Sequence, residues 1–235
     1  QVDGDYSTVG GGYTNFLNAN YATIGGGNGN LANGAYSTIA GGNGSRASAI
    51  YSTVAGGTTN STSVRNTASG DYSTVAGGAG GTASGTFSFI GGGDTETASG
   101  NYSTVGGGRN NQATLPYTVV GGGQSNTASG AWSTVGGGNV NIVSGDYSFI
   151  GGGTTNTISG QYSVIAGGQQ NEVQSNHSFA GGRHMHLLVG ADNTFLWGYS
   201  AVAVNVTRSN AFLIYSGNVG IGTNAPASKF HVVGD

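Results

Sequence analysis

One pattern of apolar and polar positions recurs along most of the chain with a period of 15 residues. An aromatic residue is followed by Ser, then usually Thr, then Val or Ile, then a run of small residues rich in Gly. The aromatic position holds Tyr6, Tyr21, Tyr36, Tyr51, Tyr72, Phe87, Tyr102, Tyr117, Trp132, Tyr147 and Tyr162, with His177 in twelfth place. The step from Tyr51 to Tyr72 is 21 residues, so one repeat carries a six-residue insertion within residues 58–67.

Three further positions keep phase with the aromatic residue. The position three residues later is Val or Ile, including Val9, Ile24, Val105 and Ile150, and ends with Ala180. The position five residues later is always Gly, from Gly11 to Gly182. The position nine residues later is usually Asn: Asn15, Asn30, Asn60, Asn111, Asn126, Asn141, Asn156 and Asn171. Because a disordered linker has no reason to hold such phase, the pattern predicts an ordered repeat.

The repeat predicts an all-β fold, a parallel β-solenoid or β-roll of about twelve coils. Alternation in Tyr-Ser-Thr-Val is typical of a strand with Ser and Val on one face and the aromatic residue and Thr on the other. The Gly pair predicts a turn, because it supplies dihedral angles that a side chain resists. A second short strand is expected around Asn15–Leu17 and Asn156–Ser159. Asn at a fixed position would then form a ladder from coil to coil.

The outward positions predict association of several chains. Each coil offers about two inward aliphatic side chains, which is little burial against the backbone entropy of fifteen residues. The outward Thr position becomes apolar in later coils, at Phe89, Val119, Phe149, Val164 and Phe179. A row of aromatic side chains beside these residues would be an exposed apolar patch on a single chain. This face is therefore expected to pack against copies of itself around a symmetry axis.

Two segments carry a family resemblance. Ala98–Gly108 (ASGNYSTVGGG) and Ala128–Gly138 (ASGAWSTVGGG) resemble the head repeats of trimeric autotransporter adhesins. The resemblance covers about Gly4–Gly182 and implies a left-handed parallel β-roll that assembles as an obligate homotrimer. This chain has Thr-Val-Gly where that family has Val-Ala-Ile, so the resemblance leaves open which face lies in the trimer interface.

The last quarter of the chain departs from the period. We divide the chain into a β-roll at residues 1–182, a non-repetitive β region at 183–216, and a C-terminal neck at 217–235. Asn193–Trp197 and Asn210–Ile214 are candidates for two degenerate coils. Gly217–Asp235 is similar to the segment that precedes an endosialidase-type intramolecular chaperone in phage tail fibres. That resemblance implies a trimeric fibre whose chaperone cuts itself off after assembly, and no chaperone sequence is present in this chain.

Composition narrows the possible partners and activities. The 235 residues include 49 Gly, no Cys, six basic and nine acidic side chains, with a net charge of −3. So few basic side chains form no patch for nucleic acid, and no stretch approaches a ~20-residue membrane span. The Gly runs lack the Gly-Lys-Ser/Thr of a phosphate loop, and only Asp94 approaches the acidic residue that a calcium-binding roll needs in every turn. No acid–base pair or nucleophilic triad emerges, so we expect no enzyme activity.

His184-Met185-His186 is the single metal-like spacing. Residues two apart lie on one face of a strand, and three chains around an axis would bring six imidazoles together, enough for an octahedral transition metal. The resemblance is to His-x-His sites in phage fibre shafts. An exposed or capping pair at the end of the roll is the alternative, and otherwise no cofactor is expected.

Variable polar residues after the Gly turn form the candidate binding rim. Loops on a rigid scaffold carry recognition more often than cores do. The rim comprises Arg65, Arg109, Asn110, Gln124, Gln169 and Gln170. A solvated edge is the alternative for each of these residues.

Together these observations predict a homotrimeric extracellular fibre on a virion tail or a bacterial surface. The first hypothesis is a phage or phage-like tail fibre that binds a cell-surface receptor or glycan. The second is a bacterial adhesin or matrix filament. An ice-binding solenoid is less well supported, because Phe and Val interrupt the Thr row. A monomeric binding solenoid is a further alternative, and it differs from the fibres in predicting one chain in solution.

Overall fold

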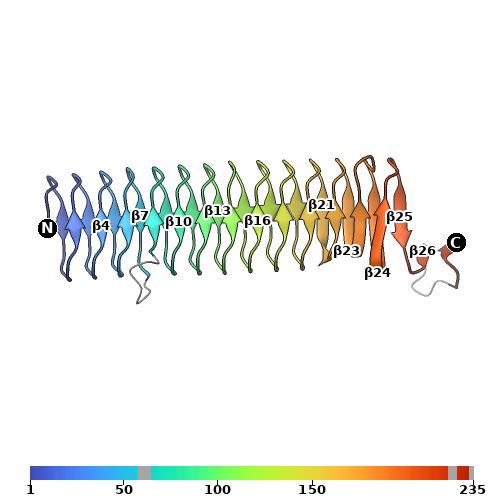
Figure 1. The fold of residues 1–235 in the computed structure, drawn as a ribbon, viewed down its shortest axis with the longest axis horizontal. Helices are drawn as coiled ribbons and strands as arrows, with labels where there is room; N and C mark the ends of the chain where they lie inside the picture. Colours follow the sequence, from blue (N-terminus) through green and yellow to red (C-terminus); the bar gives the residue numbers. More distant parts are fainter. Residues whose placement is uncertain (58–64, 222–226, 233–235) are drawn as a thin grey trace.

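The computed structural model describes residues 1–57, 65–221 and 227–232, and within them it is all-β, with no helix. The chain winds into a single parallel β-solenoid of about 13 turns, which stack along one long axis (Figure 1). The all-β parallel solenoid predicted from the repeat is therefore confirmed. The structure has about one turn more than the twelve expected, because stacking continues beyond Gly182.

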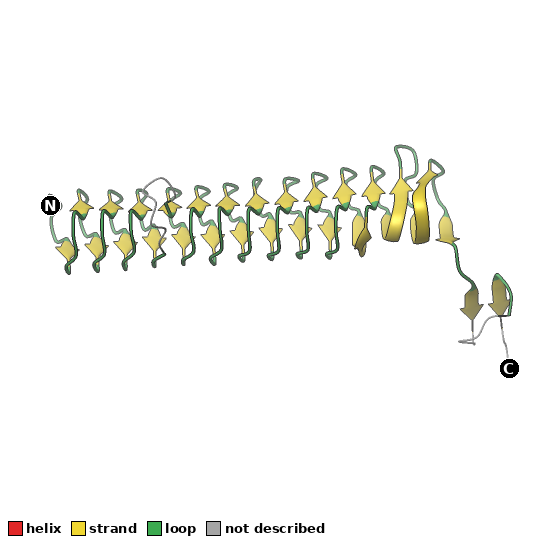
Figure 2. Ribbon diagram, turned by 60° about the horizontal axis from the view of Figure 1, so that its bottom comes forward, coloured by secondary structure: helices red, strands yellow, loops and turns green. Residues whose placement is uncertain are grey.

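Two columns of short strands line the solenoid, as the two rows of arrows in Figure 2 show. The first column contains β1 (Thr8–Val9), β3 (Thr23–Ile24), β5 (Thr38–Ile39), β7 (Thr53–Val54), β9 (Thr74–Val75), β11 (Phe89–Ile90), β13 (Thr104–Val105), β15 (Val119–Val120), β17 (Thr134–Val135), β19 (Phe149–Ile150), β21 (Val164–Gln169), β23 (Phe179–Leu187), β24 (Phe195–Val206) and β25 (Phe212–Tyr215).

The second column contains β2 (Phe16–Leu17), β4 (Leu31–Ala32), β6 (Arg46–Ala47), β8 (Thr67–Ala68), β10 (Thr82–Ala83), β12 (Thr97–Ala98), β14 (Gln112–Ala113), β16 (Thr127–Ala128), β18 (Ile142–Val143), β20 (Thr157–Ile158) and β22 (Glu172–Val173). Within each column every strand pairs in parallel with its equivalent one coil away. Thr104 of β13, for example, lies opposite Val119 of β15.

The core is a narrow seam between the two columns. The second residue of each two-residue strand points inward, and this residue is fully buried from β2 to β22. Val or Ile fills the first column and mostly Ala fills the second, so one coil contributes one larger and one smaller apolar side chain. Ser103, Ser133 and their equivalents are buried beside them, so Ser and Val share the inner face and Thr lies on the outer face.

The repeating aromatic residue lies at a corner before the strand, and not in the strand as the alternation predicts. From Tyr6 to His177 its φ lies between 53° and 61°, the left-handed region that side chains seldom adopt. This conformation lets its N–H bond to the preceding coil, as Tyr147 does to the Ala131 carbonyl at 2.9 Å. The rings stack from Tyr6 to His177, with adjacent centroids 4.6–5.1 Å apart. Stacking thus accompanies a strained corner in every coil.

The second glycine of each pair has a positive φ and the closer contact with the next coil, and the first has a positive φ only at Gly92, Gly107 and Gly167. Gly138 has φ +94°, and a Cβ there would lie 2.2 Å from the Gly153 carbonyl oxygen of the next coil. Gly137 is not in the left-handed region, and a Cβ there would meet nothing closer than 3.8 Å. Close contact between coils therefore explains Gly138 but not Gly137.

The coil with the insertion keeps its place in the stack. Residues 58–64, including Asn60, lie outside the described residues. Asn66 takes the Asn position of this coil, because its amide donates to the Gly56 carbonyl ten residues earlier, where other coils have a separation of four. Thr67 of β8 then pairs with Arg46 of β6, so strand pairing continues past the insertion without a change of register.

The region after Gly182 continues the same stack with longer coils. Phe179 pairs with Phe195, and Phe195 with Phe212, so the spacing becomes 16 and then 17 residues. Their rings stack at 4.9 and 4.8 Å. Gly182 lies opposite Gly168, so it occupies the position of Gly138 and not the position of Gly137 to which the sequence phase assigned it. Beyond this stack, β26 (Val219–Ile221) pairs in parallel with β27 (Phe230–Val232).

Candidate functional site

The polar rim predicted from the sequence forms two adjacent rows along one edge of the solenoid. Arg109 and Gln124 lie in one row, joined by a parallel bridge, and Gln169 continues this row through Thr154. Asn110 and Gln170 lie in the next row, where both have a left-handed φ near 55°. Each donates its backbone N–H to the coil before, as Asn110 does to the Asp94 carbonyl at 2.8 Å.

Arg65 belongs to the second row although it follows the insertion. It directly precedes the ladder residue Asn66. It also lies next to Gly44 of the coil before, because a Cβ added to Gly44 would be 3.9 Å from the Arg65 Cγ. The six predicted rim residues therefore lie on one edge but are spread over many coils. They do not converge on a common point.

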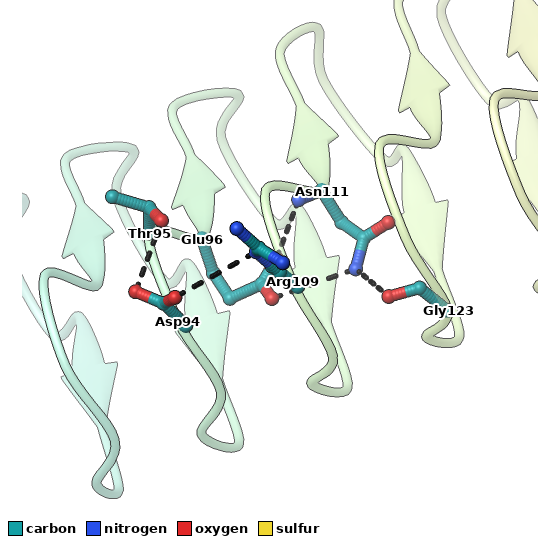
Figure 3. A network of polar contacts seen from close by, with 6 residues as sticks. All are labelled: Asp94, Thr95, Glu96, Arg109, Asn111 and Gly123. Carbon is teal, nitrogen blue, oxygen red and sulfur yellow. Dashed lines mark hydrogen bonds and ion pairs between the residues drawn. The ribbon is translucent and has the colours of Figure 1, made fainter.

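One charged pair lies on the rim. The Arg109 Nε is 3.9 Å from the Asp94 carboxylate, and Thr95 Oγ1 donates to Asp94 at 3.1 Å (Figure 3). Both charged side chains are more than half exposed, so water and salt screen the attraction. This pair fixes side-chain positions on the edge more than it stabilises the fold.

A ladder of buried amides lies directly beneath the rim. The Asn141 side-chain amide donates to the carbonyls of Gly137 and Gly153 at 2.9 and 3.0 Å. Its oxygen accepts the backbone N–H of Asn156 at 3.0 Å. Asn30, Asn126 and Asn156 make the same contacts in their own coils. Each Asn thus satisfies three backbone groups at a turn closed to water.

Glu96 occupies one position of this ladder, a feature that sequence reasoning missed. Its side chain is 1% exposed, and its Oε2 accepts the Asn111 N–H at 2.7 Å (Figure 3). Burial raises the pKa of the Glu96 carboxyl above its ordinary value, against the lowering effect of the hydrogen bonds from Asn111. The phase could have located this residue, because Glu96 stands nine residues after Phe87, where most coils have Asn.

The two histidines lie on β23 on either side of the buried Met185. His184 Nδ1 lies 2.9 Å from the Ser200 carbonyl and its Nε2 lies 2.7 Å from the Gln170 side chain. His186 Nε2 lies 3.1 Å from the Gln170 carbonyl, and its Nδ1 lies 3.6 Å from Glu172. All four ring nitrogens therefore have partners within the chain. The described residues of one chain hold no group of three or more potential metal ligands. The predicted site draws its imidazoles from three chains, so it stays a prediction.

A surface hollow of about 490 Å³ lies at the C-terminal end of the rim, across β21, β23, β24 and β25. Its walls combine two aromatic side chains, one Arg and one Gln over a floor of glycine. The lining residues are Gly168, Gln169, Gly182, Arg183, Trp197, Gly198, Tyr199 and Ser216. Only Gln169 of these was predicted as a binding residue, because Arg183, Trp197 and Tyr199 lie in coils where the 15-residue phase no longer marks equivalent positions.

A scan against models of known protein families gives no match to this chain, and a search of curated proteins finds no match either. Among the described residues, no helix has the length and apolar character needed to cross a bilayer.

Proposed function

We propose that this chain is a structural and adhesive element of an extracellular homotrimeric fibre, and specifically of a phage or phage-like tail fibre. The β-solenoid supplies a long, stiff rod, and the rim supplies a surface on which sequence varies from coil to coil. The observation that carries the proposal is a face of the rod that presents apolar side chains and bare glycine to the outside.

The outward face of the first strand column becomes apolar toward the C-terminal end. Phe89 and Phe149 are 40% and 41% exposed, although each lies in the middle of a strand column. The stacked rings of Phe179, Phe195 and Phe212 prolong the same row. A contiguous apolar row of this kind is costly in water, and a second chain that covers it would remove that cost.

The glycine column next to this face is explained within one chain only at Gly92, Gly107 and Gly167, where φ is +155° to +158°. From Gly11 to Gly167 every coil has Gly at this position, yet a Cβ would meet nothing within 4 Å at Gly11, Gly26, Gly41, Gly56, Gly77 and Gly92. None of the first five of these has a positive φ. A position that is open in the monomer but never carries a side chain is explained if another surface approaches closely there.

The number of copies comes from the resemblance. Ala98–Gly108 and Ala128–Gly138 are similar to repeats that assemble as trimers, and Gly217–Asp235 is similar to a segment of trimeric tail fibres. That last segment favours the tail fibre over the second candidate, a bacterial surface adhesin or matrix filament. An ice-binding role is supported less well, since Phe89 ends the outward Thr row that runs from Thr8 to Thr74.

The first test measures the mass of the particle in dilute buffer, for the parent and for variants that add a side chain to the glycine column. We expect three chains by light scattering for the parent, and single chains for Gly137→Arg. Gly137→Ala serves as the matched control and keeps the trimer, because a methyl group is small. Circular dichroism should show the β-solenoid in all three proteins.

Two outcomes would overturn the assembly proposal. One is a parent protein that is a stable monomer. The other is a set of Arg substitutions at Gly122, Gly137 and Gly152 that leaves the mass of the particle unchanged. Genes next to the reading frame then separate the two fibre classes: baseplate genes support the tail fibre, and an outer-membrane anchor supports the surface adhesin.

A further inference from the structure

The hollow at the C-terminal end of the rim continues the row of Arg109 and Gln124, and adds Trp197 opposite Gly181. Gln169, Arg183 and Tyr199 lie opposite one another on β21, β23 and β24. Gly168, Gly182 and Gly198 form the adjacent row, which is the floor of the hollow. The floor cannot carry side chains, because a Cβ on Gly182 would lie 1.8 Å from the Gly198 carbonyl oxygen.

Trp197 forms the apolar wall and is held in place by a glycine. A Cβ on Gly181 would lie 2.4 Å from an indole carbon, so the ring rests directly on the backbone of β23. The Phe179 ring lies 6.5 Å away, centroid to centroid. The indole is nevertheless 45% exposed, so a rigid aromatic surface is offered to the hollow.

Arg183 forms the polar wall together with Tyr199. The guanidinium carbon lies 5.5 Å from the centre of the Tyr199 ring, and Nη1 donates to the Tyr199 hydroxyl at 3.1 Å. Neither ion pair found among the described residues involves Arg183. Its Nε is buried without a hydrogen-bond partner, so the terminal nitrogens are the ones that face the hollow. A chain with a net charge of −3 thus holds an Arg without a carboxylate partner in the part of the chain that the structure describes.

We propose that this hollow binds one carboxylate-bearing sugar unit of an acidic polysaccharide. The pyranose ring would lie against the indole of Trp197, which offers apolar surface to its C–H groups. The carboxylate would pair with the guanidinium of Arg183, whose planar fork suits two parallel hydrogen bonds. Gln169 and the Tyr199 hydroxyl supply donors and acceptors for hydroxyl groups, whereas the Ser216 hydroxyl already bonds to the Tyr199 backbone. A shallow hollow with few convergent polar groups suits a small polar ring.

A saccharide fits this hollow better than a second copy of the chain does. The glycine column that marks the proposed interface ends at Gly167, because Gly182 lies in the neighbouring column. Large exposed side chains stand beyond that point, including Trp197 and Tyr199, which is 59% exposed. The inference deepens the adhesive role proposed above and rests on it for its biological meaning. One chain nevertheless forms the whole hollow.

The test is a titration of the full chain with a tetramer of galacturonic acid, followed by saturation-transfer NMR and calorimetry. The comparison ligand is the same tetramer with its carboxylates reduced to alcohols. We expect saturable binding of the acidic tetramer and at least tenfold weaker binding of the neutral one. Arg183→Gln should abolish this preference, Arg183→Lys should keep part of it, and Trp197→Ala should weaken binding of both ligands at least tenfold.

Arg109→Gln is the matched control, because it removes a positive charge from the same rim far from the hollow, and it should bind like the parent. Equal binding by Arg183→Gln and the parent would overturn the proposal, as would the absence of binding to the acidic tetramer. Light scattering on the same samples separates this failure from failure of assembly. If Trp197→Ala yields smaller particles and the parent binds no saccharide, the hollow is part of a chain–chain contact instead.

Discussion

The strictly repeated coils and the coils after Gly182 belong to one stack but hold their register in different ways. Up to Asn171 a buried amide in most coils bonds to the turn of the next coil, and the repeat length stays at 15 outside the insertion. The Asn171 side-chain oxygen then accepts the backbone N–H of Met185, whose own side chain has no amide to continue the ladder. After Met185 the spacing of equivalent Phe residues grows to 16 and 17.

This difference teaches which element fixes the length of a coil. An amide that bonds to one carbonyl in its own turn and one in the next limits changes in the intervening residues. The insertion leaves these bonds intact at Asn66, and Asn171 keeps them across a coil one residue shorter. In the C-terminal coils the inward positions are large and apolar, as at Met185, Leu187 and Leu196. Hydrophobic burial has no direction, so coils of different length stack equally well there. The hollow proposed to bind a sugar lies where this freedom begins.

The largest expected effect comes from Gly138→Ala, which attacks the contact between regular coils. We expect a loss of about 3 kcal/mol in the free energy of unfolding, since φ +94° is strained for Ala and the methyl group would overlap the Gly153 carbonyl. The neighbouring Gly137→Ala should change stability by less than about 0.5 kcal/mol. Urea unfolding measures both, and equal losses at the two positions would contradict the assignment of the turn.

Asn141→Ala comes next and tests the ladder itself. It removes the partners of the Gly137 and Gly153 carbonyls and of the Asn156 N–H, so we expect a loss of about 2 kcal/mol. Asn139→Ala, on the exposed rim two residues earlier, is the control and should be nearly neutral. Hydrogen exchange should show faster exchange at Asn156. If Asn141→Ala unfolds at the urea concentration of the parent, the ladder does not hold the register.

The regular part of this comparison could be predicted from the sequence, and the rest could not, for a physical reason. Phase alone predicted the parallel solenoid, the inward Val105 and its equivalents, and an Asn at most turns, because equivalent positions meet equivalent environments in every coil. Phase could not predict the left-handed backbone of Tyr102, because a residue in a regular strand would also point its side chain outward. Phase also could not separate Gly107 from Gly108: φ is +155° at the first and +106° at the second, but only a Cβ on Gly108 would meet the next coil, 2.1 Å from the Gly123 carbonyl oxygen.

The candidate site was harder to predict than the fold. The rim residues were found because sequence variation at fixed phase marks an exposed edge, and the structure places Arg109 and Gln124 side by side on it. The hollow was missed because Arg183, Trp197 and Tyr199 meet only through β23–β24 pairing, which follows a register shift between Ile165 and Gly168 on β21. A shift of this kind leaves no periodic signal in the chain.

The smallest effect, and the only one expected to increase stability, comes from Glu96→Gln within the ladder. The raised pKa of Glu96 means that the folded protein holds this proton more tightly than the unfolded chain does. The contribution of Glu96 to the stability of the parent is therefore fully present below the ordinary carboxyl pKa of 4.5 and is lost as pH rises through the raised pKa.

Glu96→Gln removes this titration and supplies an amide like that of the neighbouring Asn residues, so we expect a gain of about 1 kcal/mol at pH 7 that shrinks toward pH 4. Melting temperatures across this range measure the difference. Glu172→Gln is the control, because its carboxylate is partly exposed beside His186, and it should show no such gain. A Glu96→Gln protein whose melting temperature equals that of the parent at every pH would contradict this prediction. The regular coils would then accept a buried carboxylate as readily as an amide at the ladder position.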